Sequence, residues 1–250
     1  FSDEVAKSML STKANRDSAA ASLAAVVAKY GFDGVMFDLE ELKSDDADGL
    51  IGAGGAGMRT ARPLRLLVVG DSTAMGTGVQ RLEDGVPGQL GRLLVAEVAT
   101  IGGVAWRAVG RNGATAAEVL AEFAPAAIAA HFDLAVVMVG WNDVLRLRSG
   151  GEFSRALGAL LDRLHGASPD ARLVVVAPPD FGRFSVLPNP LRWALGRHAR
   201  ALTSRAERVA HSHSTVLAPG FDGRSVASDR FHPDADGYRA LAEGIVGVLA

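Results

Sequence analysis

Short apolar runs rich in β-branched residues alternate with longer stretches rich in Ala and Leu over most of this chain. The apolar runs cover residues 64–69, 104–109, 134–139, 173–177 and, more weakly, 215–217. The longer stretches, at 88–98, 116–130, 153–165, 190–210 and 235–249, repeat their apolar residues at steps of three and four, as helices packed on a sheet do. Because this alternation is typical of a parallel sheet covered on both faces, the sequence predicts a three-layer α/β/α sandwich.

Composition limits the classes of partner. Of the 250 residues, 48% are hydrophobic and 22% are charged, so the chain can bury a substantial core in one domain, or in one domain with an appendage. The net charge is only -2, with no block of like charge, which indicates neither a nucleic-acid partner nor an anionic membrane surface. The absence of cysteine excludes disulfides, thiolate metal sites and a cysteine nucleophile.

The sequence gives little information about location. No apolar run approaches the roughly 20 residues of a transmembrane helix, so no transmembrane segment is expected. The chain begins with Phe1 and has no basic region followed by an apolar one, which leaves open an upstream targeting segment that has been removed. Without such a segment a cytoplasmic location is favoured. The oligomeric state is not indicated.

A Gly/Ala-rich stretch at 51–57 follows the acidic cluster of Asp45, Asp46 and Asp48. Its composition predicts a flexible linker. After it, Met58 begins a segment that reads like a natural start, with basic residues leading into the first apolar run. We therefore expect a functional domain at 58–250 and an N-terminal appendage with its linker at 1–57.

The appendage has a pattern of its own. A predicted helix at 15–30 is followed by a predicted strand at 31–40 that ends in Asp38 and Glu40. This strand resembles the DGxDxDxE signature of family-18 glycoside hydrolases, with Met36 in place of the middle aspartate. Since a (β/α)8 barrel needs on the order of 200 residues or more, we expect the appendage to be non-catalytic and to dock on the main domain or a neighbouring chain.

Four short motifs follow the predicted strands and precede the last helix. They are Gly70-Asp71-Ser72, Gly113, Gly140-Trp141-Asn142-Asp143 and Asp229-Arg230-Phe231-His232. In open α/β sheets, ligands bind beyond the carboxyl ends of the strands, so the motifs are predicted to converge on one edge. Each motif alone also has an ordinary explanation, as a helix N-cap, a surface histidine or a turn residue.

Together the motifs contain the parts of a serine hydrolase. If Asp229 accepts a hydrogen bond from one nitrogen of His232, the other nitrogen can take the proton of Ser72. Asn142 offers a neutral side-chain amide, and Gly113 a backbone N–H, to a developing oxyanion. The remaining histidines are assigned to solvated faces or helix ends, although His211 and His213 alternate in a way that could bind a metal weakly.

The order of these motifs resembles that of the SGNH/GDSL hydrolase superfamily, over about residues 58–250. The resemblance implies a flavodoxin-like sandwich with a five-stranded parallel sheet, in which Ser72 is the nucleophile, His232 the general base and Asp229 its partner. It assigns the oxyanion site to Ser72, Gly113 and Asn142, and implies no metal or cofactor. The implied substrates are lipids, simple esters and acetylated sugars. Thr73 stands where the family most often has leucine.

Aromatic residues near the site suggest a substrate pocket. The proline-rich segment 178–190 should overhang the same edge, with Phe181 and Phe184 lining an acyl or leaving-group pocket or, alternatively, anchoring a helix. Trp193 is a further candidate for this pocket. Trp141, inside the Asn142 turn, is predicted to touch the substrate.

The sequence thus predicts a serine esterase that works through an acyl-enzyme on Ser72. Two alternatives remain at this point. The first is a flavodoxin-like module that binds phosphate or flavin through backbone N–H groups of the turn at 70–73. The second is a sugar-active enzyme that uses Glu40.

Overall fold

The computed structural model describes residues 46–52, 62–97 and 102–249. The chain divides into two units, residues 1–43 and 44–250, and every described residue belongs to the second. The predicted helix at 15–30 and strand at 31–40, with Asp38 and Glu40, lie outside the described residues.

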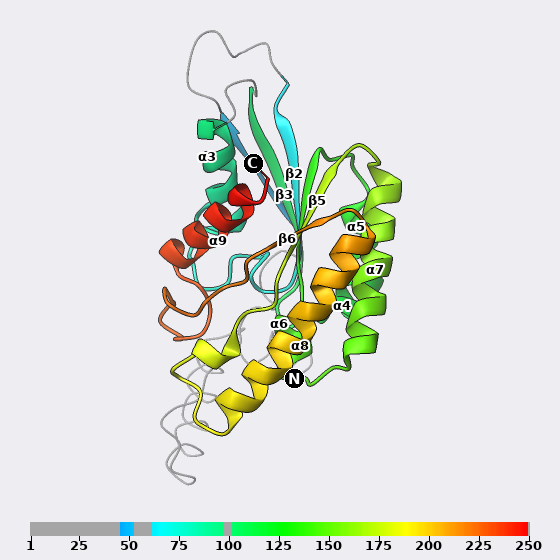
Figure 1. Ribbon diagram of the computed structural model, residues 1–250. Helices are drawn as coiled ribbons and strands as arrows, with labels where there is room; N and C mark the ends of the chain where they lie inside the picture. Colours follow the sequence, from blue (N-terminus) through cyan, green and yellow to red (C-terminus); the bar gives the residue numbers. More distant parts are fainter. Residues whose placement is uncertain (1–45, 53–61, 98–101, 250) are drawn as a thin grey trace, which may run out of the picture. The chain divides into compact units, whose positions relative to one another are not determined.

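A six-stranded sheet forms the centre of the described unit (Figure 1). Its order is β1-β3-β2-β4-β5-β6, and β2 to β6 all run parallel to one another. The strands are β1 (Asp46–Gly52), β2 (Leu64–Gly70), β3 (Gly103–Gly110), β4 (Leu134–Met138), β5 (Arg172–Val176) and β6 (Val216–Ala218). The five parallel strands agree with the prediction, and their order is that of flavodoxin-like folds.

Strand β1 was not expected. It pairs antiparallel with β3, from Asp46 opposite Val109 to Gly52 opposite Gly103. Ile51 and Gly52 therefore belong to the sheet, and the prediction that they begin a linker is wrong. The physical reason is that β3 would otherwise leave its outer N–H and C=O groups unpaired, and any extended backbone can satisfy them.

Helices cover both faces of the sheet (Figure 1). On one face lie α3 (Val86–Glu97) and α9 (Ala235–Gly247), which pack on each other. The other face is covered by α4 (Ala116–Glu118), the π-helical turn η3 (Val119–Phe123), α5 (Ala124–Ala127), α7 (Gly150–Ala167) and α8 (Leu191–Ser212). Short elements at the loops are η2 (Leu82–Asp84), α6 (Trp141–Leu145) and η4 (Phe181–Arg183). The three-layer sandwich is confirmed.

The apolar pattern explains this arrangement. The middle of β2 and of β4 is fully buried, as in Val68 and Val136, because helices lie over both faces of each strand. The helix α7 buries Leu157, Leu160 and Leu164 at three- and four-residue steps. Among the described residues, no helix is both long and apolar enough to cross a bilayer.

A glycine brings two strand ends together at the carboxyl edge. Gly70 closes β2, and a Cβ there would lie 1.9 Å from the carbonyl oxygen of Met138 at the end of β4. The N–H of the next residue, Asp71, donates to that same oxygen at 3.0 Å. The turns that leave β2 and β4 therefore start side by side.

Candidate active site

Ser72, His232 and Asp229 form a hydrogen-bonded chain at this edge. Ser72 follows β2, is only 3% exposed, and has its Oγ 3.2 Å from Nε2 of His232. The other ring nitrogen, Nδ1, lies 2.6 Å from Oδ2 of Asp229. The structure thus joins a hydroxyl, an imidazole and a carboxylate, although Ser72 and His232 are 160 positions apart.

The loop before α9 holds the histidine in place. The Oδ1 atom of Asp229 accepts backbone hydrogen bonds from Phe231 at 2.8 Å and from His232 at 3.0 Å. Burial opposes ionisation of Asp229, but these N–H groups and the imidazole outweigh it, and the pKa of Asp229 lies below its ordinary value. Asp229 is therefore ionised at neutral pH and orients the ring.

Gly113 and Asn142 lie on adjoining turns. Asn142, 8% exposed and near the start of α6, donates one amide hydrogen from Nδ2 to the carbonyl of Ala114 at 3.1 Å. The guanidinium of Arg146 donates to the Gly113 carbonyl at 2.9 Å and also to Glu118. Among the described residues, the backbone N–H groups of Ser72 and Gly113 have no acceptor. Both N–H groups are free to donate to a ligand.

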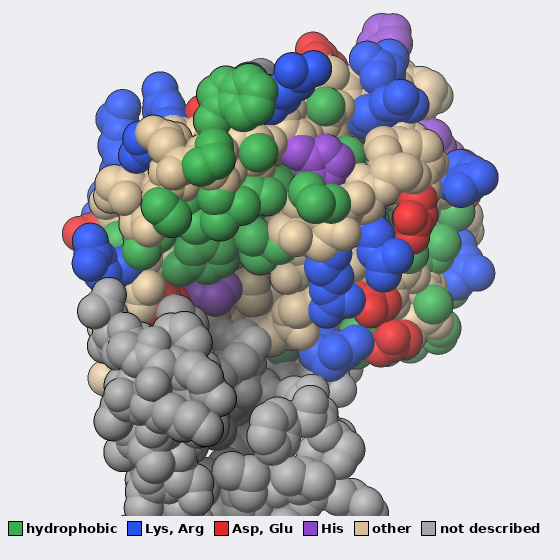
Figure 2. Space-filling view, turned by 90° about the horizontal axis from the view of Figure 1, so that it is seen from below, with side chains coloured by type: hydrophobic (Ala, Val, Ile, Leu, Met, Phe, Trp, Pro, Cys, Tyr) green, Lys and Arg blue, Asp and Glu red, His purple; other side chains and the backbone are tan. Residues whose placement is uncertain are grey.

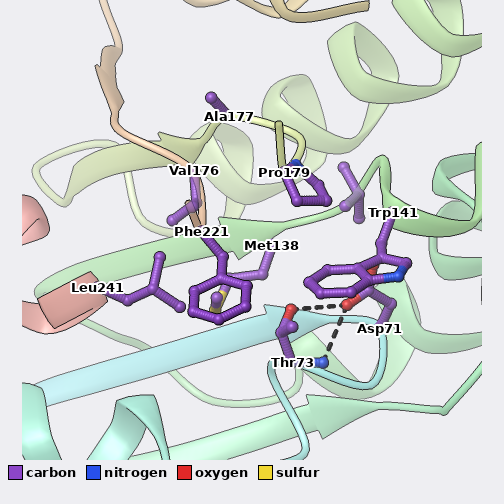
Figure 3. A pocket seen from close by; sticks show the side chains of 10 residues that line it. Asp71, Thr73, Met138, Trp141, Val176, Ala177, Pro179, Phe221 and Leu241 are labelled. Carbon is purple, nitrogen blue, oxygen red and sulfur yellow. Dashed lines mark hydrogen bonds between the residues drawn. The ribbon is translucent and has the colours of Figure 1, made fainter. Parts of the chain in front are cut away.

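Asp71 ties the serine turn together. Its Oδ1 accepts the Thr73 N–H at 3.0 Å and the Thr73 hydroxyl at 2.7 Å (Figure 3). Its carboxylate also accepts the backbone N–H of Trp141. Burial outweighs these hydrogen bonds and raises the pKa of Asp71 to about 7. Thr73, at the position where the family most often has leucine, thus donates its hydroxyl to Asp71. Sequence reasoning missed this contact.

Asp143 stabilises the Asn142 turn, as Asp71 stabilises the serine turn. It is buried, and its Oδ2 accepts the N–H of Ala116 at the start of α4 at 2.9 Å. Burial raises the pKa of Asp143 above its ordinary value, although the backbone hydrogen bond opposes this. The contact fixes the Asn142 turn to the segment that follows Gly113.

The aromatic residues lie deeper than expected. Phe181 and Phe184 are buried, and each meets the Trp141 ring edge-on at 5.7 Å between centroids. This packing fits the alternative role, as anchors in the interior, and the pocket role of Phe181 and Phe184 stays a prediction. Trp141 is only 3% exposed, stacks on the imidazole of His232 and lines the small cavity beside Asp71, so its contact with substrate also stays a prediction.

The side chains around the site leave an apolar surface. Among the described residues, the large hydrophobic side chains that are exposed are Leu145, Leu147, Val186, Leu191 and Trp193. All five lie at the end of α6, just after it, or between η4 and the first turn of α8. Figure 2 looks onto this face and shows hydrophobic side chains gathered there beside a histidine, with basic side chains around them. Trp193, 61% exposed, is the predicted pocket residue that does reach the surface.

Two cavities lie near these elements. A small one, of about 20 Å³, is lined by Asp71, Thr73, Trp141 and Phe221 among others (Figure 3). A larger one, of about 210 Å³, is lined by Gly182, Asn189, Arg192, Trp193 and Arg200.

Two of the remaining histidines have partners of their own among the described residues. His213 lies 3.3 Å from Asp162 and also contacts the Val209 carbonyl, and His131 pairs with Ser168 at 2.8 Å. Within the described ranges, no group of three or more His, Asp or Glu side chains could hold a metal ion. The weak metal site considered for His211 and His213 finds no support there.

The sequence is similar to that of known proteins. The model of the GDSL-like lipase/acylhydrolase family matches residues 68–240. The GDSL-like esterase Rv1075c of Mycobacterium tuberculosis is 30% identical over 214 residues, which cover 79% of this chain and 67% of that protein.

Solved structures show the same fold at lower identity. TesA is 24% identical with a TM-score of 0.58, over 74% of this chain and 97% of that one. The acetylxylan esterase Axe2 of Geobacillus stearothermophilus is 18% identical with a TM-score of 0.55, over 76% of this chain and 95% of that one. Since the family model covers most of the chain, this protein belongs to the GDSL-like lipase/acylhydrolase family and is an esterase of the GDSL type.

Proposed function

We propose that this chain hydrolyses carboxylic esters through a covalent acyl-enzyme on Ser72, with His232 as general base and Asp229 as its orienting partner. The observation that carries the proposal is the continuous hydrogen-bonded chain from Ser72 Oγ to His232 Nε2, at 3.2 Å, and from His232 Nδ1 to Asp229 Oδ2, at 2.6 Å. An ionised Asp229 favours the tautomer with its proton on Nδ1, so the lone pair of Nε2 faces the hydroxyl.

The first half of the reaction forms the acyl-enzyme. As Ser72 Oγ bonds to the ester carbonyl carbon, its proton passes to Nε2 of His232, and the carbonyl oxygen becomes an oxyanion. The bond from the carbonyl carbon to the alcohol oxygen then breaks, and the imidazolium gives its proton to that oxygen. The alcohol leaves.

The second half of the reaction hydrolyses the acyl-enzyme. A water oxygen attacks the acyl carbon while His232 takes one of its protons. The bond to Ser72 Oγ then breaks, and the proton returns to that oxygen, releasing the carboxylic acid. Every step uses side chains of this chain and water, so the proposal includes no metal or cofactor.

The oxyanion is assigned to three donors. The N–H groups of Ser72 and Gly113 have no acceptor among the described residues, and Asn142 uses one of its two amide hydrogens on Ala114. A neutral, pre-positioned donor stabilises the oxyanion more than the carbonyl of the bound ester, so it accelerates the reaction rather than only tightening binding.

The surroundings favour an uncharged ester with an apolar portion. The exposed hydrophobic residues at this edge, Leu145, Leu147, Val186, Leu191 and Trp193, support a substrate with an aliphatic or aromatic part. Acetylated sugars remain a second class, because Axe2, which has the same fold, is an acetylxylan esterase.

A substrate panel tests the proposal. Intact protein and Ser72→Ala are assayed with p-nitrophenyl esters of increasing acyl length and with acetylated xylooligosaccharides. The proposal predicts turnover by the intact protein, highest on the p-nitrophenyl esters, and none by Ser72→Ala. Turnover of no ester, or full activity of Ser72→Ala, would contradict it.

We also propose that the N-terminal appendage has no chemical role in this reaction. In the full chain, Glu40→Gln is expected to keep the wild-type rate on the ester that the panel selects. If Glu40→Gln lost activity while Ser72→Ala kept it, the sugar-active alternative would replace the serine mechanism.

A further inference from the structure

We propose that Trp141 is a positioning residue that holds the His232 imidazole by stacking on it and stabilises its protonated form during the reaction. The inference rests on the proposed role of His232 as general base. In the 140–143 turn, Asn142 is assigned to the oxyanion site and Asp143 holds the Ala116 N–H. The inference assigns a function to the remaining side chain, Trp141.

The stacking geometry is the first observation. The rings of Trp141 and His232 are nearly parallel, at an interplanar angle of 16°, with their centroids 5.5 Å apart. This lies within the range of offset stacking and within the reach of a cation–π contact. The Asp229 carboxylate and the Ser72 hydroxyl hold the two ring nitrogens, whereas the indole packs on the face of the ring and restrains its tilt.

The indole is itself held from several sides. Phe181 and Phe184 meet it edge-on, each at 5.7 Å, and Phe221 stacks near it at 6.2 Å and 17°. Phe231, from the histidine loop, meets it edge-on at 5.1 Å. A ring packed in this way has little freedom to move, so it can serve as a rigid support for the imidazole.

The backbone at Trp141 connects the support to the rest of the site. Trp141 is the first residue of α6, and its N–H donates to the carboxylate of Asp71, beside the nucleophile. The next residue is Asn142, the proposed oxyanion donor. One short segment therefore sets the base and the oxyanion donor relative to each other.

The indole N–H does not explain why this residue is buried here. Nε1 of Trp141 is buried and has no hydrogen-bond partner among the described residues. The indole therefore contributes no hydrogen bond, and burying its unpaired donor costs free energy that other contacts of the ring must offset. What remains is the ring itself, its area and the negative charge of its face.

The charge of the ring face matters because His232 changes charge during the reaction. The imidazole is neutral before attack and positive in each tetrahedral intermediate. The face of an indole attracts a cation more than a neutral ring, so the contact strengthens as the reaction proceeds. From the size of such contacts we expect an effect of roughly 2- to 30-fold on the rate.

Three carboxylates belong to the turns that meet at the site. Asp229 is bonded to His232 directly at 2.6 Å. Asp71, in the serine turn, and Asp143, in the Asn142 turn, are hydrogen-bonded to Thr73 and to the Ala116 N–H. Asp229 is held by backbone N–H groups of its own loop and not by the Trp141 side chain, so we assign a shift in the pKa of His232 in Trp141→Leu to loss of the indole.

The test compares Trp141→Leu with Phe181→Leu in the full chain. Both remove an aromatic ring from the same buried cluster, but the ring contacts of Phe181 are with Trp141, Phe184 and Phe231, not His232. The pKa of His232 is measured by NMR titration of its ring Cε1–H. The acid limb of the kcat/KM profile is measured in parallel.

Trp141→Leu is expected to lower the pKa of His232 by roughly 0.3 to 1.5 pH units, which corresponds to the same 2- to 30-fold effect. The acid limb of the profile should move to lower pH, while kcat falls and KM changes little. Trp141→Phe keeps an aromatic face and should move the pKa less, and Phe181→Leu should not move it. An unchanged or raised pKa in Trp141→Leu, or an equal shift in Phe181→Leu, would overturn the inference.

A second measurement covers the case in which Trp141→Leu does not fold. Fluorinated tryptophan, incorporated biosynthetically, withdraws charge from the ring face with little change in volume. The pKa of His232 should fall as fluorine atoms are added to the ring. The fall should be the same in a Trp193→Phe background as in wild type. A constant pKa would overturn the inference. A pKa shift in a protein that hydrolyses no ester would show that the stack exists although the proposed function fails.

Discussion

Replacing Gly78 by Ala tests how closely the turn after β2 supports the histidine loop. Gly78 has a φ of 101°, and a Cβ built there lies 2.3 Å from the carbonyl oxygen of Pro233 and 3.2 Å from Cβ of His232. The carbonyl belongs to the backbone and cannot rotate away as a side chain does. The loop must therefore move back by about 1 Å to reach an ordinary van der Waals separation.

Such a movement acts directly on the reacting groups. The distance from Ser72 Oγ to His232 Nε2 is already 3.2 Å, so a further retreat of about 1 Å takes it out of hydrogen-bonding range. A displacement of this size at a catalytic group typically costs about 10²-fold in rate. Since alanine at a positive φ is also strained, we expect a loss of stability of about 1–3 kcal/mol.

The assay is steady-state hydrolysis of a short-chain p-nitrophenyl ester, after circular dichroism has shown that the variant is folded. Gly166→Ala is the matched control, because a Cβ on Gly166 in α7 meets nothing within 4 Å. The control should keep full activity and be equally or slightly more stable, by about 0.5–1 kcal/mol. Wild-type kcat in folded Gly78→Ala would refute the reasoning.

Three further substitutions test separate parts of the site. Burial raises the pKa of Asp71 to about 7, so its contribution to stability is present below the ordinary aspartate pKa of about 4 and is lost as pH rises through about 7. As pH rises from about 4 to about 7, urea unfolding should therefore show Asp71→Asn becoming more stable relative to wild type. A difference in the free energy of unfolding that does not change with pH would contradict this. Asn142→Ala should lower kcat by about 10²–10³-fold with little change in KM, and a wild-type kcat would remove Asn142 from the oxyanion site. Asp229→Asn should lower kcat by roughly 10²–10⁴-fold because the imidazole loses its orienting acceptor, and steady-state assays that find less than a tenfold loss would argue against that role.

Much of the fold could be predicted because the parallel strands are buried on both faces. That burial leaves nearly continuous apolar runs, such as the one that became β4 (Leu134–Met138), and helices between them with a regular apolar face. Strand β1 (Asp46–Gly52) could not be predicted in this way. Its sequence, with two aspartates and two glycines, has low strand propensity, and it is held by backbone pairing with β3 that side-chain patterns do not record.

The site shows the same limit at the level of single contacts. The motifs predicted that Ser72 and His232 would lie at one edge of the sheet, and the structure brings them within 3.2 Å. Contacts between loops, such as Arg146 on the Gly113 carbonyl, depend on how turns meet in space and have no sequence signal. The role of Phe181 could not be predicted, because an aromatic residue in a loop can either line a pocket or pack beneath it, and the choice depends on neighbouring rings such as Trp141.

Covalent labelling tests the central claim most directly. A p-nitrophenyl alkylphosphonate mimics the tetrahedral intermediate and forms a stable bond to an activated serine oxygen. The account predicts that release of p-nitrophenolate, loss of esterase activity and a phosphonyl adduct on the Ser72 peptide follow the same time course, and that Ser72→Ala and His232→Ala acquire no adduct. Inactivation with Ser72 unmodified, or with the adduct on another residue, would contradict it.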